Sequence, residues 1–274
     1  SKSNVCAKMG TALLNVSNLA LSFGGISALA DVSIEVSASS LVSVIGPNGS
    51  GKTSLLNCIS GRYEPRRGAI SFEGRDLTQE SAATRASYGI SRTFQNLALF
   101  KHLSVIDNIL VGRHRRFRPN VLLDGVFWGA SRQREVMARA EIEAIIDVLE
   151  LQSLRNRAAG TLAYGQQKKV ELARALAMSP RLLLLDEPMA GMTLTEKEDM
   201  AKYILHINRT MGIAIVMIEH DMRVVMDLSD RITVLSFGRV IAEGPPDDIF
   251  SNSEVQRTYL GDPKMFDEIA KSRA

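Results

Sequence analysis

Apolar residues fall along this chain in short runs typical of buried strands and in longer periodic stretches typical of helices. Three runs with hardly any polar position lie at residues 41–45, 182–185 and 213–218. Strands that are buried on both faces of a parallel sheet have this pattern. In residues 12–36, by contrast, Ile34 and Val36 flank Glu35, and the alternation predicts half-buried strands joined by turns. Together these patterns predict an α/β fold with a parallel sheet.

Helical periodicity dominates the middle of the chain. Apolar residues recur at helical spacing over residues 131–151, and a further helix is expected over residues 167–178. Both stretches predict a helical lobe inserted into the α/β core. Residues 113–130 hold a proline and two glycines, which predicts irregular or weakly helical structure. Farther along, Thr195 and Glu198 have the spacing of a capping box, which predicts a helix that begins there.

The composition is that of a folded protein, since 45% of the 274 residues are hydrophobic and 23% are charged. A net charge of +3 does not single out nucleic acid as a partner. Cys6 and Cys58 provide neither a disulfide framework nor metal-ligand spacing, and they fit a reducing, cytosolic setting. Residues 1–4 are polar, so no signal peptide is predicted. No apolar run approaches the roughly 20 residues that span a bilayer.

The strongest chemical signal is a glycine-rich stretch between the run at 41–45 and a helix predicted at 52–60. It fits G-x-x-x-x-G-K-[ST], and its residues are Gly46, Pro47, Asn48, Gly49, Ser50, Gly51, Lys52 and Thr53, followed by Ser54. The glycines let backbone N–H groups turn toward an anion, and the helix adds its positive end. Lys52 can reach the β- and γ-phosphates of ATP, and the Thr53 hydroxyl can bind Mg²⁺.

Two carboxylates follow the run at 182–185 directly. Asp186 and Glu187 lie at the carboxyl end of a predicted strand, where ligands bind in open α/β sheets. Asp186 can hold Mg²⁺, usually through water, and Glu187 can polarise an attacking water as a general base. On its own, the pair also fits two solvated acids at the end of a strand.

His220 lies two residues beyond the run at 213–218. A lone histidine is more often structural than catalytic. Here, however, three predicted strands end at Gly46, at Asp186–Glu187 and at His220. Because such ends meet at one edge of a parallel sheet, these residues are predicted to converge, with His220 near the γ-phosphate.

These motifs together resemble the ATPases of ABC transporters, over about residues 13–260. The family signature, commonly Leu-Ser-Gly-Gly-Gln, takes the form Leu162-Ala163-Tyr164-Gly165-Gln166. Gln95 matches the family glutamine that binds Mg²⁺ and orients water. Phe23 matches the aromatic residue that stacks on adenine, and a plain core residue is the alternative.

The resemblance implies a P-loop NTPase core with a parallel sheet, an antiparallel β subdomain near the N-terminus and an inserted α-helical subdomain. It implies a single ABC ATPase domain whose parts are residues 11–95 and 180–250 for the nucleotide-binding core, 96–179 for the helical subdomain and 251–274 for a helical tail.

The resemblance further implies that MgATP is sandwiched between two such subunits. Residues Ala163, Tyr164, Gly165 and Gln166 of one subunit would approach the γ-phosphate held by the other. The implied partners are a second ABC ATPase, identical or homologous, transmembrane permease subunits and, indirectly, a solute-binding protein. The chain is therefore expected at the cytoplasmic face of the inner membrane, with no nucleic acid partner.

Three departures from the common pattern are informative. Ala163 removes a hydroxyl that usually contacts the γ-phosphate, Tyr164 replaces a glycine, and Thr193 stands where most members have an acid. Because of Thr193, communication between the two ATP sites is expected to differ. The signature at residues 162–166, the Ala190-Gly191 pair after Pro188 and the segment Ile218-Glu219-His220-Asp221-Met222 resemble the branched-chain amino acid importer ATPases, whose relatives also move urea, short amides and aromatic acids.

The alternative is a soluble ABC ATPase that acts on ribosomes or DNA, although such proteins usually carry two cassettes or long coiled coils. Residues 113–118 form a dense basic run that could face lipid head groups or nucleic acid, and a solvated loop is the preferred interpretation. Residues 96–100 either line a groove for a membrane partner or form a packed connector.

Overall fold

The computed structural model of this chain describes residues 12–93, 98–114 and 139–259. Its strands are β1 Leu14–Phe23, β2 Ile26–Val36, β3 Leu41–Ile45, β4 Arg67–Phe72, β5 Arg75–Asp76, β6 Ile90–Arg92, β7 Leu182–Asp186, β8 Ala214–Ile218, β9 Arg231–Ser236 and β10 Arg239–Gly244. Its helices are α1 Lys52–Ile59, α2 Ala82–Ser87, α3 Val105–His114, α6 Tyr164–Leu176, α7 Leu194–Arg209, α8 Met222–Leu228, α9 Pro246–Ser251 and α10 Ser253–Tyr259. Residues 139–148 are also helical, and short 3₁₀ turns occupy Gln152–Leu154 and Ala159–Thr161.

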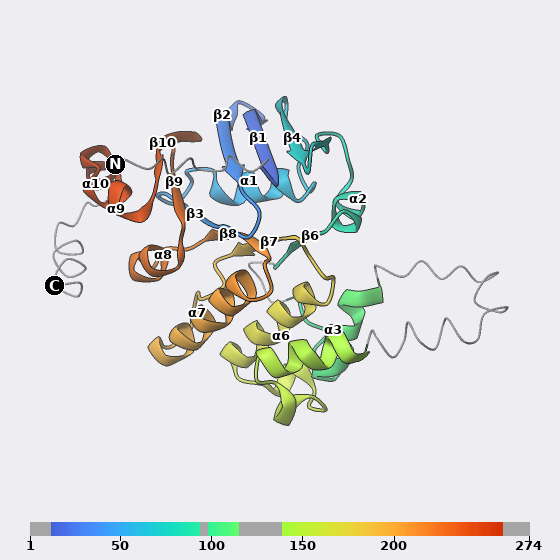
Figure 1. The fold of residues 1–274 in the computed structure, drawn as a ribbon. Helices are drawn as coiled ribbons and strands as arrows, with labels where there is room; N and C mark the ends of the chain where they lie inside the picture. Colours follow the sequence, from blue (N-terminus) through green and yellow to red (C-terminus); the bar gives the residue numbers. More distant parts are fainter. Residues whose placement is uncertain (1–11, 94–97, 115–138, 260–274) are drawn as a thin grey trace, which may run out of the picture.

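A six-stranded sheet with the order β10-β9-β3-β8-β7-β6 forms the centre of the molecule (Figure 1). Its pairs are parallel except for β10, which runs antiparallel to β9. Leu182 and Leu184 of β7 pack into the core on one face, whereas Leu183 and Leu185 pack into the core on the other. Successive side chains of a strand point to opposite faces, which explains why this run is apolar at every position and confirms the α/β prediction.

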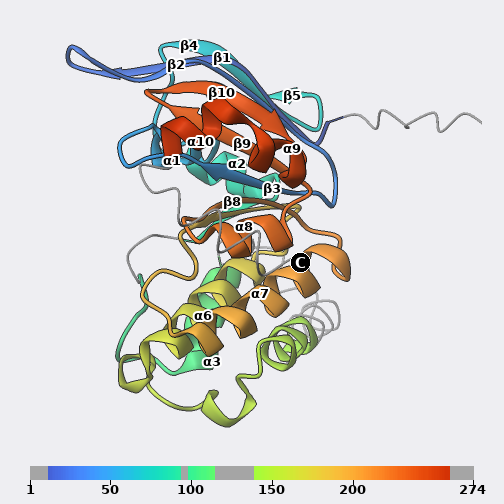
Figure 2. The same cartoon turned by 90° about the vertical axis from the view of Figure 1, so that its left-hand side faces the viewer.

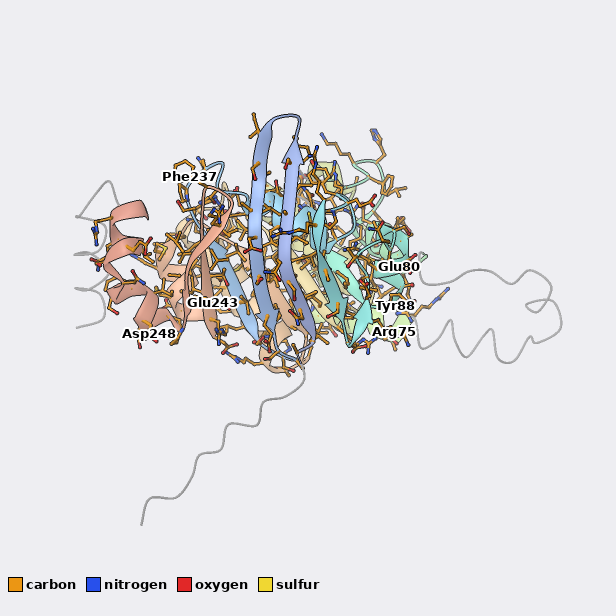
Figure 3. The ribbon with its side chains drawn as sticks, turned by 90° about the horizontal axis from the view of Figure 1, so that it is seen from above. Arg75, Glu80, Tyr88, Phe237, Glu243 and Asp248 are labelled. Atoms are coloured by element: carbon orange, nitrogen blue, oxygen red, sulfur yellow. The ribbon has the colours of Figure 1, made fainter. Side chains whose placement is uncertain are left out.

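An antiparallel sheet with the order β2-β1-β4-β5 covers one face of the central sheet, and α1 lies between the two (Figures 1 and 2). In β2, Ile34 and Val36 are buried and Glu35 is exposed, which confirms the predicted alternation. Seen from above in Figure 3, Arg75 and Tyr88 lie at the side of this sheet near α2, where the guanidinium stands 5.0 Å from the ring centroid.

Helices α3, α6 and α7 and the helix at residues 139–148 pack together against the opposite face of the central sheet (Figures 1 and 2). The helix expected over residues 131–151 is present in its described part. The structure corrects the expectation of a solvated basic loop at one position. Arg113 belongs to α3 and is buried in an ion pair with Glu141. A solvated loop therefore does not begin at Arg113, and residues 115–130 lie outside the described part.

Two predicted helix starts were wrong, one by three residues and the other by two. The helix after the signature begins at Tyr164 rather than at residue 167, so Tyr164, Gly165 and Gln166 belong to its first turn. The capping box of α7 uses Thr193 and Glu196, not Thr195 and Glu198. The Thr193 hydroxyl accepts from the Glu196 N–H at 3.4 Å, and the Glu196 carboxylate accepts from the Thr193 N–H at 2.9 Å.

Thr193→Ala is expected to lower the free energy of unfolding by about 1 kcal/mol at neutral pH, because it removes this cap. Bonds from the N–H of Thr193 and, to a lesser degree, from its hydroxyl hold the pKa of Glu196 below the ordinary value of a glutamate. The ionised carboxylate is therefore the form that the fold favours. The part of the stabilisation that comes from the bond between the Thr193 hydroxyl and this carboxylate is present above the unfolded pKa and is lost as pH falls through the lower folded value. Urea titrations of the wild type and of Thr193→Ala at neutral and acidic pH measure the difference in the free energy of unfolding.

Thr195→Ala is the matched control, because Thr195 is exposed in the first turn of the same helix. Alanine has the higher helix propensity, so this variant is expected to match or slightly exceed the wild type. An equal loss in the two variants would contradict the assignment of Thr193 as the cap.

Candidate active site

The glycine-rich stretch forms a tight loop between β3 and α1, as predicted. Gly46 has φ +152°, and a Cβ there would lie 2.1 Å from the carbonyl oxygen of Leu235, so no side chain fits. The turn between β9 and β10 supports the loop from outside, because the Gly238 N–H donates to the Ser50 carbonyl at 3.0 Å. Phe237 lies at this turn and is 89% exposed (Figure 3). Gly51 caps α1, whose first N–H groups have no partner within the helix and can bind an anion.

Lys52 is the first residue of α1 and is only 6% exposed. Its Nζ donates to the carbonyl oxygens of Gly46 at 2.7 Å and Pro47 at 2.9 Å, so the ammonium lies across its own loop. Burial lowers the pKa of Lys52, whereas the charges of Glu187 and Asp186 raise it. The ammonium is thus close to both carboxylates predicted to act with it.

Asp186 is the last residue of β7 and has no exposed surface. Arg92 donates to its Oδ2 at 2.8 Å, whereas its Oδ1 is buried and has no hydrogen-bond partner. A carboxylate with one free oxygen suits Mg²⁺, which nucleotide sites bind through one or two carboxylates plus phosphates. Within the described residues, no three or more His, Cys, Asp or Glu side chains group as a self-sufficient metal site.

Glu187 follows in the left-handed region, with φ +51°, and its N–H donates to the Ile218 carbonyl at 3.0 Å. A non-glycine residue held there costs about 1–3 kcal/mol, and such outliers cluster at functional sites. The bend brings Glu187 Oε1 to 2.8 Å from Nε2 of His220, which follows β8. The predicted convergence of Asp186, Glu187 and His220 with the loop at Lys52 is therefore seen in the structure.

Glu219 has a place in this site that the sequence did not indicate. It is 4% exposed, and it accepts from the N–H of Met189 at 3.2 Å and from the N–H of His220 at 2.8 Å. Burial raises the pKa of Glu219, although these two bonds and the charges of His220 and Lys197 lower it. Glu219 therefore ties the segment after Glu187 to the segment that carries His220.

The signature residues lie on a different face of the molecule. Helix α6 packs on the side of the central sheet opposite α1, so the signature is not gathered with the loop at residues 46–53 (Figure 1). The side chain of Gln166 accepts from the N–H of Ala163 at 3.2 Å, and Tyr164 is 44% exposed. The Tyr164 ring packs on Gly191, while Glu196 contacts Gly165, so this helix start is held against the start of α7.

Two further predicted residues have separate outcomes. Phe23 lies at the tip of the β1–β2 hairpin, is 48% exposed, and meets Tyr63 edge-on with ring centroids 5.2 Å apart. The alternative of a plain core residue is therefore wrong, and an exposed ring is available for stacking.

Gln95 lies outside the described residues, and so does Leu97 in the connector. Of that connector, Phe100 is 52% exposed and Leu99 packs against the core.

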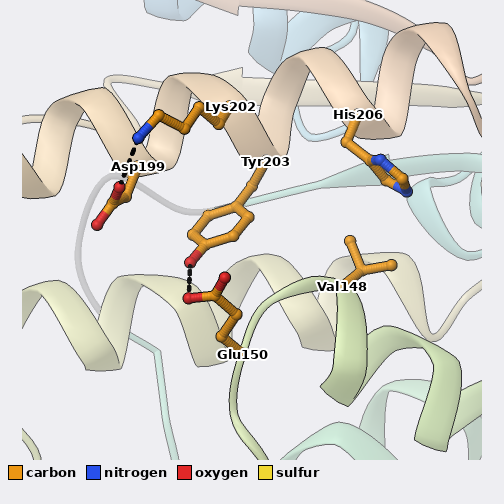
Figure 4. A pocket seen from close by; sticks show the side chains of 6 residues that line it. All are labelled: Val148, Glu150, Asp199, Lys202, Tyr203 and His206. Atoms are coloured by element: carbon orange, nitrogen blue, oxygen red, sulfur yellow. Dashed lines mark hydrogen bonds and ion pairs between the residues drawn. The ribbon is translucent and has the colours of Figure 1, made fainter.

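A pocket of about 300 Å³ lies away from these motifs, between α7 and the segment that follows the helix at residues 139–148 (Figure 4). It is lined by Val148, Glu150, Asp199, Lys202, Tyr203 and His206. Tyr203 accepts from Lys169 of α6 and donates to Glu150, both at 2.9 Å, and Lys202 pairs with Asp199. Much of this pocket is therefore lined by side chains that already pair with one another where α7 packs against neighbouring helical segments.

Comparison with known proteins decides the family. The family model described as "ABC transporter" matches residues 29–190, which is more than half of the chain. This chain belongs to the ABC transporter family. A second model, described as "Branched-chain amino acid ATP-binding cassette transporter", matches residues 239–264. The resemblance inferred from the motifs is thereby confirmed, and the chain is an ABC transporter ATPase.

Similar proteins cover nearly the whole chain. The branched-chain amino acid transport ATP-binding protein BraF of Pseudomonas aeruginosa is 39% identical over 93% of this chain and 100% of its own length. A solved ABC transporter cassette in its ADP conformation has a TM-score of 0.80 at 33% identity, over 92% of this chain and all of its own. A dimeric bacterial cassette has a TM-score of 0.72 at 25% identity, over 85% and 98% of the two chains. No helix in the described part is long and apolar enough to cross a membrane.

Proposed function

We propose that this ABC ATPase drives an importer of branched-chain amino acids and hydrolyses MgATP at the site where β3, β7 and β8 end. The 2.8 Å contact between Glu187 and His220, next to Asp186 and the loop at Lys52, carries the catalytic part of the proposal. The similarity to BraF supports the cargo. Import rather than export rests on that similarity as well.

Each residue has a role that its position supports. Lys52 and the N–H groups of residues 46–53 would bind the β- and γ-phosphates. Thr53, Asp186 and Gln95 would hold Mg²⁺, which when bound supplies positive charge to the phosphate oxygens. Glu187 would take the proton of the attacking water, and His220 would orient Glu187 and contact the γ-phosphate. Phe23 would stack on adenine.

A second cassette, identical or homologous, would complete each site. The start of α6 is partly exposed at Tyr164 and presents the N–H groups of a helix N-terminus. In a dimer, Ala163, Tyr164, Gly165 and Gln166 of one subunit would face the γ-phosphate held by the other. The dimeric cassette found among the structural relatives supports this arrangement.

Permease subunits and a solute-binding protein would convert the opening and closing of this dimer into transport. The ATPase would bind the permease at the cytoplasmic face of the membrane, and the exposed Phe100 is a candidate contact. The cargo is not expected to contact this chain.

Leucine uptake tests the proposal in cells that lack this gene and carry a plasmid copy. The wild-type copy is expected to restore uptake of labelled leucine, and Glu187→Gln is expected to fail, because transport needs hydrolysis. Glu198→Gln is the control, since Glu198 is exposed on α7 and should restore uptake fully. Urea, a short amide and benzoate are measured in parallel. A response to one of these but not to leucine would contradict the cargo, and no response at all would contradict the importer.

A further inference from the structure

Arg92 is a buried arginine that joins three elements of the active site. It ends β6, and its side chain is 9% exposed. Its Nη2 donates to Asp186 Oδ2 at 2.8 Å. Its Nη1 donates to Asn57 Oδ1 at 2.6 Å and to Ser60 Oγ at 3.1 Å, both at the end of α1. One guanidinium thus links β6, the phosphate-loop helix α1 and the strand that carries Asp186.

This bonding makes the two oxygens of Asp186 unequal. Oδ2 is occupied by Arg92, whereas Oδ1 is buried without a hydrogen-bond partner. A planar guanidinium anchored on α1 through one nitrogen fixes the direction from which the other nitrogen meets the carboxylate. The carboxylate therefore has one defined orientation, with Oδ1 left for another ligand.

We infer that Arg92 is a positioning residue that orients Asp186 so that Oδ1 faces the Mg²⁺ of bound MgATP. The inference rests on the proposed cation-binding role of Asp186. Ligating carboxylates are commonly held by hydrogen bonds from surrounding residues, and the loss of such a partner lowers metal affinity about 10- to 100-fold. Arg92 lies 94 positions from Asp186 in the chain, so only the pairing of β6 with β7 brings the two together.

If Arg92 acted only through its charge, its removal would change the Mg²⁺ affinity in the opposite direction. A guanidinium beside Asp186 repels a cation, so an arginine that acted only through its charge would weaken Mg²⁺ binding, and its removal would tighten it. Because Asp186 is fully buried and Arg92 holds it by a direct bond, orientation is expected to outweigh this repulsion. The sign of the change in Mg²⁺ affinity therefore separates the two effects.

The test measures binding of a fluorescent ATP analogue to the full chain, first in EDTA and then during a Mg²⁺ titration. Arg92→Met preserves most of the side-chain volume and removes the bonds. It is expected to raise the half-saturating Mg²⁺ concentration about tenfold or more, while affinity in EDTA stays within about twofold. Arg92→Lys keeps the charge, but one ammonium cannot bond α1 and Asp186 as the fork does, so an intermediate rise is expected. Arg67→Met, which removes an exposed ion pair with Asp31, is the matched control.

An unchanged or lower half-saturating Mg²⁺ concentration in Arg92→Met would overturn the inference, as would an equal loss of binding in EDTA. Ser60→Ala removes one anchor of Arg92 without touching Asp186, and it keeps the test decisive if Arg92→Met does not fold. It should also weaken Mg²⁺ binding, and no effect in both Ser60→Ala and Arg92→Lys would overturn the inference. Asp186→Asn tests the underlying role, because an unchanged Mg²⁺ response there would refute the proposed cation site itself, whatever Arg92 does.

Discussion

Glu187→Gln is expected to lower ATP turnover by about 10²- to 10⁴-fold, the usual contribution of a general base, while ATP binding persists. The amide has nearly the same shape as the carboxylate but cannot accept the proton of the attacking water. Glu187 lies outside residues 46–53 in the chain, and glutamine keeps its shape, so the nucleotide contacts of that loop should survive. Phosphate release measures turnover, and equilibrium binding of a fluorescent ATP analogue measures affinity.

A second readout distinguishes a lost base from a damaged fold. In the proposed dimer, ATP that is not hydrolysed would stay between the two subunits, so size-exclusion chromatography in MgATP should show more dimer than in the wild type. Glu198→Gln is the control, because it makes the same chemical change on an exposed face of α7. Turnover near wild type in Glu187→Gln would mean that another group takes the proton.

Lys52→Met is expected to weaken ATP binding about 10- to 100-fold, because a hydrogen bond to a charged group contributes about 1.5–3 kcal/mol. Methionine retains most of the buried volume but cannot bond a phosphate. Binding of a fluorescent ATP analogue measures the loss. Lys202→Met is the control, since it removes a lysine that is 72% exposed and paired with Asp199 on α7.

Without nucleotide, the same variant should be about as stable as the wild type. Burial lowers the pKa of Lys52, which means that the folded protein bears a cost for keeping this ammonium away from water. An apolar side chain removes that cost but also removes the two bonds to the Gly46 and Pro47 carbonyls, so the melting temperature without ATP is expected to change little, while the increase on adding ATP shrinks. Undiminished ATP binding by Lys52→Met would contradict the assigned role of Lys52.

The helices, strands and phosphate loop of this fold could be predicted from the sequence because contiguous patterns mark them. The run at residues 182–185 is apolar at each position, as a strand covered on both faces requires, and the loop after β3 follows a contiguous glycine motif, although only the structure shows that Gly46 meets the Leu235 carbonyl. Strand ends in a parallel sheet meet at one edge, so the approach of Asp186, Glu187 and His220 could also be predicted.

Helix starts were harder to predict, for a physical reason. Thr193 and Thr195 each stand three residues before a glutamate, and the two patterns are equivalent in sequence. Only the backbone distinguishes them, because Thr193 is extended, with φ −66° and ψ 164°, whereas Thr195 is already helical. The cap is therefore decided by how the chain leaves the segment after Pro188.

The sequence by itself determined the family, the order of strands and helices along the chain and the residues predicted to bind ATP, since contiguous motifs carry that information. Only the tertiary structure decided which buried polar groups meet. Strand pairings between distant positions bring Arg92 to Asp186, to which it donates a hydrogen bond, and bring Glu219 to the N–H of Met189, from which it accepts one. A buried polar side chain needs a partner, but nothing in its own neighbourhood of the sequence says where that partner lies, because the register and order of β6, β7 and β8 supply it.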